Sequence, residues 1–108
     1  MNLKDKKCIP CEGGTPSLTS EETKTLLKKV SEWQLDSAVK KIWRAFSFKN
    51  FVEAMKFVNR VADIAETEGH HPDIHIFYNR VHIELWTHAV NGLSENDFIV
   101  AAKIDALM

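Results

Sequence analysis

Two runs of alternating apolar and polar residues, which together span residues 73–86, constrain the fold more than any other feature of this sequence. A period of two predicts β-strands with one buried side, and the break at Asn79-Arg80 predicts a two-residue hairpin turn. If these two residues form the turn, Ile76 lies opposite Ile83, and one side of the hairpin is almost wholly apolar. The chain therefore contains an antiparallel hairpin that needs other elements to cover that side.

The other side of the same hairpin is rich in histidine. In this register His71 lies opposite His88, and His75 lies opposite Glu84. Directly opposed residues have Cβ atoms about 4.5–5.5 Å apart, so His71 and His88 can act on one small molecule although they are remote in sequence. We interpret His75 and the neighbouring His82 as exposed residues of the sheet.

A third imidazole stands at the corner that leads into the hairpin. Gly69 is predicted to end the preceding helix, and Pro72 biases His71 towards extended backbone, so His70 and His71 occupy a helix-to-strand corner. Glu66, one helical turn before His70, can hydrogen-bond to an imidazole or to a ligand N–H. The corner therefore gathers a carboxylate and two imidazoles at one accessible place.

Three helices are predicted from their capping signals. In a capping box, a polar residue before the helix and an acidic residue three positions later each accept a hydrogen bond from the other's backbone amide. For Asp97, this cap is the simplest interpretation. The pairs with this spacing are Thr19 and Glu22, Asn50 and Glu53, and Ser94 and Asp97.

The central helix is predicted to be the longest, ending at Gly69. Before it, Trp33 and Leu35 alternate with polar neighbours, Asp36-Ser37 can turn, and residues 39–48 are β-prone, which together predict a first β-hairpin. The apolar residues of the central helix recur at helical spacing, which predicts one buried face. They are Phe51, Met55, Val58, Ala62 and Ala65.

The elements follow the order α-β-β-α-β-β-α. We therefore predict an α+β fold in which three helices cover one face of a four-stranded antiparallel sheet. A chain of 108 residues suits one such domain, expected at residues 18–108 after a flexible N-terminal leader over residues 1–17. Within that leader, Cys8 and Cys11 form a single C-x-x-C, a weak signal for a metal or redox site without a second pair.

The charge balance and hydropathy of the chain exclude several classes of partner. Lys and Arg together number 14 and Asp and Glu 15, so no bulk field recruits nucleic acid or an anionic membrane directly. No apolar run approaches the length of about 20 residues that spans a bilayer, and the N-terminus lacks the apolar core of a signal peptide. We expect a cytoplasmic protein.

The histidines of the corner and hairpin suggest proton-transfer chemistry. Imidazole has an unperturbed pKa of about 6.5 and can act as acid or base near neutrality. The sequence has no convincing Ser/His/Asp series, phosphate-binding glycine loop or cofactor fingerprint. Proton transfer without a covalent intermediate, such as elimination or addition of water, fits this set. Because His71 and His88 share a face in the predicted register, we expect them to handle protons directly.

Longer motifs around these histidines resemble those of one family. The motifs are E-T-E-G-H-H-P at residues 66–72, Y-N-R-V-H-I at 78–83, T-H at 87–88 and G-L-S-E-N-D at 92–97. In this order and spacing they resemble the pterin-4a-carbinolamine dehydratases, over nearly all of the chain outside the leader. Two positions depart from the animal members: Gly69 replaces an acidic residue, and Trp86 replaces a small one.

The resemblance implies the fold predicted above and an enzyme that dehydrates 4a-hydroxytetrahydropterin to quinonoid dihydropterin in tetrahydropterin recycling. It implies no metal and no cofactor, and its expected partners are the pterin substrate and further copies of the chain in a homodimer or homotetramer. It also implies that His70, His71 and His88 are catalytic. The residues expected to bind or surround the pterin are Glu66, Gly69, Trp33, Trp86 and Thr87.

Two alternatives use the same features. His71, His88 and either Asp73 or Glu66 can form a two-histidine, one-carboxylate metal site. The second alternative is an interaction module, since animal relatives also serve as dimerisation cofactors for a homeodomain transcription factor. An exposed apolar stripe on the central helix, or an unpaired edge strand, would support self-association.

Overall fold

The computed structural model describes residues 2–10 and 16–108, and its elements follow the predicted order α-β-β-α-β-β-α. The helices and strands are α1 (Ser20–Leu27), β1 (Gln34–Leu35), β2 (Ile42–Ser47), α2 (Phe51–Glu68), β3 (Asp73–Phe77), β4 (Arg80–Leu85) and α3 (Glu95–Asp105). Short 3-10 turns occur at η1 (Leu3–Asp5), η2 (Lys28–Val30) and η3 (His88–Val90). The predicted α+β fold is confirmed.

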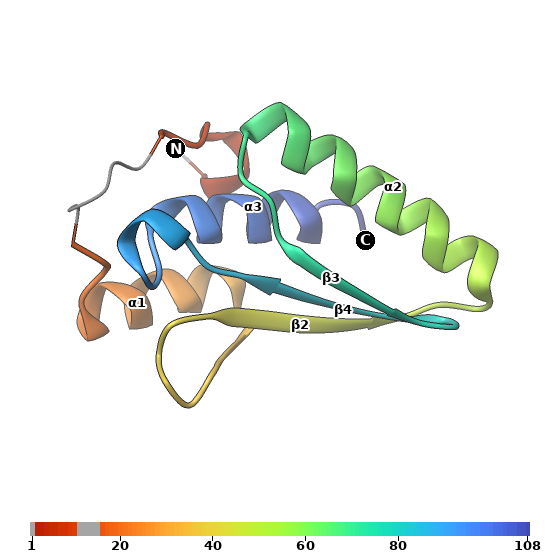
Figure 1. Ribbon diagram of the computed structural model, residues 1–108, viewed down its shortest axis with the longest axis horizontal. Coiled ribbons are helices and arrows are strands. Elements are labelled where there is room, and N and C mark those ends of the chain that lie inside the picture. Colours follow the sequence, from red (N-terminus) through yellow and green to blue (C-terminus); the bar gives the residue numbers. More distant parts are fainter. Residues whose placement is uncertain (1, 11–15) are drawn as a thin grey trace.

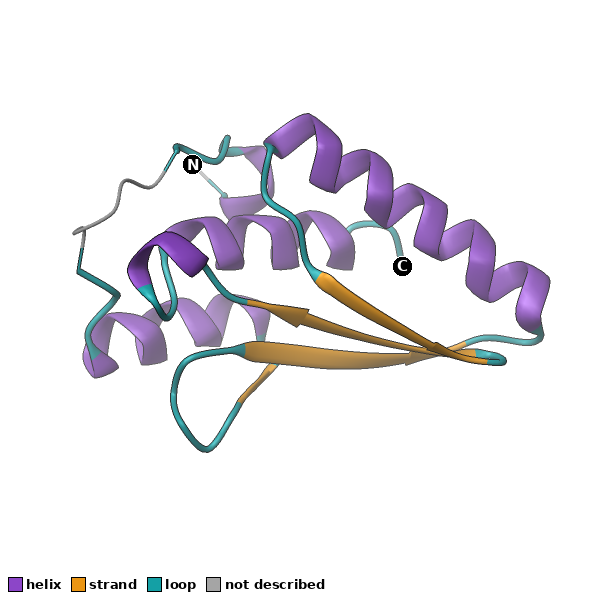
Figure 2. Cartoon of the chain, in the orientation of Figure 1, coloured by secondary structure: helices purple, strands orange, loops and turns teal. Residues whose placement is uncertain are grey.

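The four strands form one antiparallel sheet in the order β1-β2-β4-β3. All three α-helices lie on one side of this sheet (Figures 1 and 2). Alternation along β4 sends Val81, Ile83 and Leu85 into the core, where they are fully buried. The opposite face of the sheet is open, and on it the ring of Trp43 stacks on His82 at 5.1 Å between centroids.

Capping explains where the helices begin. Thr19 and Glu22 form the predicted capping box of α1, and Ser94 and Asp97 form that of α3. At α2, the Asn50 side chain accepts a hydrogen bond from the backbone N–H of Glu53 at 2.9 Å. These local signals predicted all three helix starts correctly because each is satisfied within a few residues of the chain.

The buried face of α2 differs from the predicted one. Phe51, which begins the predicted stripe, is 48% exposed, whereas Phe57 is buried against Phe46 and Phe48 at centroid distances of 4.6 and 5.0 Å. The large ring of Phe57 therefore sets the rotation of the helix, since aromatic contacts dominate the area that it can bury. The residues of α2 that are buried are Ala54, Phe57, Val61 and Ala65.

The turn of the second hairpin lies one residue earlier than predicted. Ile76 pairs with Val81 and not with Ile83, so Tyr78-Asn79 form the turn, and Tyr78 adopts a left-handed φ of +53°. Asn79 is held by the loop before α2: its side-chain amide donates to the carbonyl of Phe48 at 2.9 Å, and its own carbonyl accepts from the Phe48 N–H at 2.8 Å. These tertiary bonds fix the register.

The corrected register changes which residues lie opposite each other, but every side chain stays on its predicted face of the sheet. The reason is that the pairing shifts by two positions, and side chains along a strand alternate between the faces with a period of two. His75 now lies opposite His82, so the predicted pairing of His75 with Glu84 is wrong. The predicted pairing of His71 with His88 is also wrong. β3 begins at Asp73 and β4 ends at Leu85, so both histidines lie beyond the ladder.

Residues 2–10, the described part of the predicted leader, lie against α3. Leu3 is buried in the main core, and the Lys103 ammonium on α3 donates to the carbonyl of Lys4 at 2.9 Å. This part of the leader therefore covers the side of α3 that faces away from the sheet (Figure 1). Of the two cysteines in the predicted C-x-x-C, Cys11 lies outside the described residues.

Candidate functional site

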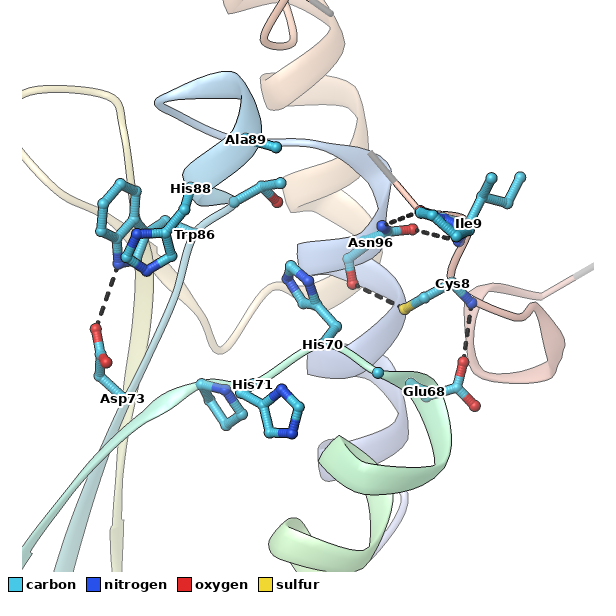
Figure 3. Close-up of a pocket in the computed structure, with 14 residues that line it drawn as sticks. Cys8, Ile9, Glu68, His70, His71, Asp73, Trp86, His88, Ala89 and Asn96 are labelled. Carbon is cyan, nitrogen blue, oxygen red and sulfur yellow. Dashed lines mark hydrogen bonds between the residues drawn. The ribbon is translucent and has the colours of Figure 1, made fainter. Parts of the chain in front are cut away.

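A cavity of about 620 Å³ opens where the C-terminal end of α2 meets η3 and the leader (Figure 3). The lining comes from three parts of the chain that are distant in sequence: residues 8–10, residues 68–73 and residues 86–89, with Asn96 of α3. Most of the residues expected from the family resemblance take part. They are His70, His71, His88, Gly69, Trp86 and Thr87.

Gly69 directs the chain into this cavity. It ends α2 in the left-handed conformation, with a φ of +65°, and its N–H donates to the carbonyl of Ala65. The helix therefore stops at Glu68, with Gly69 as its cap, and the chain turns sharply enough for the side chains of His70 and His71 to point in different directions (Figure 3). The predicted corner is present.

His70 is held by a buried carboxylate. Its Nε2 lies 2.6 Å from Oδ1 of Asp97, and the side chains are 11% and 0% exposed. A carboxylate only accepts hydrogen bonds, so Nε2 carries the proton, and in the neutral ring Nδ1 is left as a proton acceptor. This pair fixes both the orientation and the tautomer of His70.

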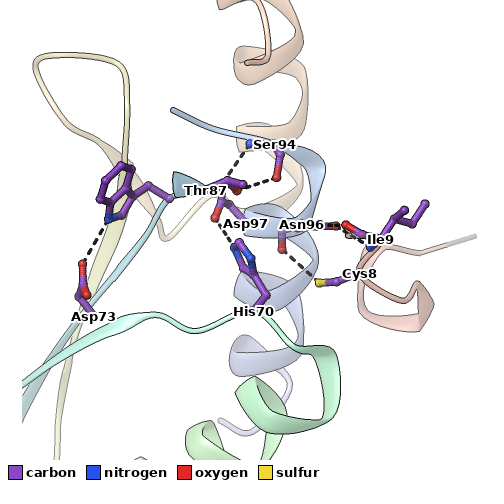
Figure 4. A network of polar contacts seen from close by, with 9 residues as sticks. Cys8, Ile9, His70, Asp73, Thr87, Ser94, Asn96 and Asp97 are labelled. Atoms are coloured by element: carbon purple, nitrogen blue, oxygen red, sulfur yellow. Dashed lines mark hydrogen bonds and ion pairs between the residues drawn. The ribbon is translucent and has the colours of Figure 1, made fainter. Parts of the chain in front are cut away.

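The second carboxylate oxygen of Asp97 is also fully used (Figure 4). Oδ2 accepts from the Thr87 hydroxyl at 2.8 Å and from the Ser94 backbone N–H at 3.0 Å. Since Thr87 donates its hydroxyl proton to Asp97, the Ser94 hydroxyl at 2.7 Å must donate to Thr87. The network joins the end of β4, the start of α3 and His70 into one rigid unit.

His71 has a carboxylate partner of a different kind. Its Nε2 lies 2.5 Å from Oε2 of Glu66, but here the side chains are 61% and 78% exposed. Glu66 does not line the cavity itself and reaches it only through His71. The structure therefore offers one buried and one exposed histidine-carboxylate pair on the same corner.

His88 begins η3 and lies against Trp86, with ring centroids 3.8 Å apart. The indole N–H of Trp86 donates to Oδ2 of Asp73 at 3.3 Å, and the Lys41 ammonium lies 5.3 Å from the Trp86 ring centroid. These three contacts restrain the position of the indole. His88 thus faces the cavity from the side opposite the leader (Figure 3).

Trp33 lies outside this cavity. It is buried in the core beside Phe46, and its indole N–H donates to Oδ1 of Asp105 at 2.8 Å, an oxygen that also accepts from Arg44 at 2.6 Å. The apolar ring and its single donor are both satisfied there. The structure therefore does not bring Trp33 to the other predicted site residues.

Two contributions to the site were missed by sequence reasoning, namely the carboxylate that holds His70, and the leader. Asp97 was interpreted only as a helix cap, because the Ser94 spacing already accounted for it. The leader was missed because nothing in its composition indicates what it contacts. Its Cys8 lines the cavity, and the thiol donates to the carbonyl of Asn96 at 3.7 Å. Burial first, and then the carboxylate of Glu68, raise the pKa of Cys8 to about 12.

The geometry does not favour the metal-binding alternative. Within residues 2–10 and 16–108, no three His, Cys, Asp or Glu side chains cluster closely enough to hold a metal ion. What the cavity does present is several imidazoles, two of them paired with carboxylates, which is a set suited to proton transfer.

In residues 2–10 and 16–108, no helix is long and apolar enough to cross a membrane.

Comparison with known proteins identifies the family. The sequence pattern of the family described as pterin 4 alpha carbinolamine dehydratase matches residues 16–107. A provisionally named pterin-4-alpha-carbinolamine dehydratase of Nitrosomonas eutropha is 53% identical over 108 residues, covering 99% of this chain and 94% of that protein. The corresponding protein of Halorhodospira halophila is 48% identical over 107 residues, covering 99% and 98%.

A solved structure agrees with these sequences. The crystal structure of a transcriptional coactivator/pterin dehydratase from Brucella melitensis superposes with a TM-score of 0.81 at 37% identity, covering 84% of this chain and 97% of that one. Fold, motif positions and sequence identity over nearly the whole chain point to the same group of hydro-lyases. The chain therefore belongs to the pterin-4-alpha-carbinolamine dehydratase family.

Proposed function

We propose that the chain dehydrates 4a-hydroxytetrahydropterin to quinonoid dihydropterin by histidine acid/base catalysis, as part of cytoplasmic tetrahydropterin recycling. The observation that carries this proposal is the convergence of His70, His71 and His88 on one cavity. In the reaction the C4a–O bond breaks and the hydroxyl leaves as water after it accepts a proton. The adjacent ring N–H loses its proton, and its electron pair forms the C=N bond of the product.

The two proton transfers suit different histidines. Because His71 and His88 lie beyond the strand pairing, we revise the expectation that these two alone handle the protons. His70, whose Nε2 proton is directed to Asp97, has Nδ1 as its acceptor and is suited to remove the ring N–H proton. The exposed His71 and His88 are suited to protonate the departing hydroxyl and to exchange protons with water. Glu66 orients His71 by the hydrogen bond to its Nε2.

The test is a stopped-flow dehydration assay with chemically generated 4a-hydroxytetrahydropterin. Replacing His70, His71 or His88 by Ala is expected to lower turnover at least about 100-fold, since a positioned acid or base contributes about 10²–10⁴. The matched controls are His75→Ala and His82→Ala, whose rings lie on the open face of the sheet. Unchanged turnover in the three cavity variants would refute the proposal.

We also propose that the protein self-associates. β3 is an edge strand of the sheet, and exposed apolar side chains gather at the hairpin tip and at the start of α2. The two regions lie at the same end of the molecule because Asn79 is bonded to Phe48. This hairpin-end patch consists of Phe51, Val52, Ile76, Phe77 and Tyr78.

A further inference from the structure

The leader forms one side of the cavity that holds the histidines. Cys8, Ile9 and Pro10 line it together with His70 and His88. In Figure 3 the leader lies on one side of His70, while Trp86 and His88 lie on the other. A ligand that fills the cavity between these two sides therefore meets the leader.

Two buried side chains attach this segment. A carboxylate oxygen of Glu68, whose side chain is 7% exposed, accepts from the backbone N–H of Cys8 at 2.9 Å. The amide of Asn96 bonds to Ile9 twice, accepting from its N–H at 3.0 Å and donating to its carbonyl at 2.6 Å. An irregular segment has no helix or sheet hydrogen bonds for its backbone groups, and these side chains supply the missing partners.

The attachment points adjoin the catalytic groups. Glu68 precedes His70 by two positions at the end of α2, and Asn96 precedes Asp97 in the first turn of α3. The leader is therefore bonded to the same two helix ends that set the distance between His70 and Asp97. A shift of either helix end moves the leader as well.

A second anchor lies outside the cavity. The Lys103 ammonium donates to the carbonyl of Lys4 and lies 3.5 Å from Glu68. Burial opposes ionisation of Glu68, but the Cys8 N–H and the Lys103 charge outweigh it and lower the pKa of Glu68. The carboxylate therefore stays ionised at neutral pH, and both of its oxygens remain engaged.

We propose that leader residues 8–10 form a wall of the pterin-binding cavity, that Glu68 and Lys103 are positioning residues which hold this wall, and that a bound pterin contacts it. The identity of the ligand rests on the proposed function, whereas the attachment of the wall does not. A wall fixed before binding costs no ordering entropy when the ligand arrives. Releasing it is expected to weaken pterin binding without removing any histidine.

The experiment combines amide hydrogen exchange at Cys8 and Ile9, measured by NMR, with the Kd for 7,8-dihydropterin, a stable relative of the product. In Glu68→Ala and Lys103→Met, exchange at Cys8 is expected to accelerate at least about tenfold. In both variants the Kd is expected to rise at least about threefold. Lys103 does not line the cavity, so its effect on Kd must act through Glu68 and the leader.

The matched control is Lys6→Ala, which removes an exposed ion pair between the leader and Glu95 at 3.1 Å. Exposed pairs of this kind contribute little, so exchange at Cys8 and Kd should both stay at the wild-type values.

Wild-type exchange in Glu68→Ala would show that the wall is not held as proposed. Faster exchange with an unchanged Kd would show that the pterin does not contact it. If 7,8-dihydropterin does not bind the wild-type protein at all, the proposed function and the ligand part of this inference both fail, while the exchange result still decides the attachment.

Discussion

Asp97 has two roles, one for each of its carboxylate oxygens: it caps the start of α3, and it holds the ring of His70. Oδ2 caps the helix through the Ser94 N–H, and Oδ1 lies 2.6 Å from Nε2 of His70. Local helix formation and the tautomer of a candidate catalytic ring thus depend on the same buried side chain. A substitution that replaces only one of the two oxygens can separate helix capping from the effect on His70.

We expect Asp97→Asn to fold but to lower kcat at least about tenfold. Its carbonyl oxygen can still accept from Ser94 and Thr87, but its NH₂ group then faces His70 and forces the other tautomer, as in serine proteases with the same change. Asp97→Ala should also lose about 1–3 kcal/mol of stability, because buried donors are left unpaired. Urea denaturation and the dehydration assay measure the two effects, and wild-type kcat in Asp97→Asn would contradict the assignment.

The thiol of Cys8 predicts a pH dependence of stability. Burial and Glu68 raise its folded-state pKa to about 12 from 9.0, so between these values the unfolded chain has lost a proton that the native chain retains. Stability from this group is therefore complete below pH 9.0 and declines as pH rises towards 12. In a Cys11→Ser background, the free energy of unfolding should fall more between about pH 8 and pH 10.5 with Cys8 than with Cys8→Ser. Equal slopes would show that folding does not raise the pKa of Cys8.

At the scale of elements, the helix starts could be predicted from sequence and the strand register could not. Thr19, Asn50 and Ser94 find their partners within three residues, so the signal is wholly local. The turn at Tyr78 is set instead by bonds from Asn79 to Phe48, which no hairpin rule contains. The imidazoles nevertheless line one cavity, because the corner at Gly69 and the start of η3 position them independently of the strand pairing.

Gly69 is the residue on which that corner depends. We expect Gly69→Ala to cost about 1 kcal/mol of stability, because an L-residue is disfavoured at a φ of +65°. Apart from Gly69 and its two chain neighbours, no heavy atom of residues 2–10 and 16–108 lies within 4 Å of the place a Cβ would take, so the cost is one of backbone conformation alone. Gly69→Asn is the control and should lose less, since Asn tolerates this region. Urea denaturation of both variants checks the order, and a larger loss for Asn would contradict it.

At the scale of the whole molecule, light scattering tests the proposed self-association. The wild-type protein is expected to form a dimer or tetramer, and Phe77→Glu to dissociate it, because a charge in the hairpin-end patch is costly to bury. Phe77 is 65% exposed, so the fold should persist. Met108→Glu is the control, with a side chain 62% exposed at the C-terminus. A monomeric wild-type protein would contradict the proposal.

α3 is enclosed on nearly all sides, by α2, by α1 and η2, and by η1 of the leader. The matched family pattern begins only at residue 16. A recombinant version trimmed to that boundary would uncover apolar helix surface that the native chain keeps from water, and such surface promotes precipitation. The solubility of the purified protein therefore depends on residues that precede the matched family pattern.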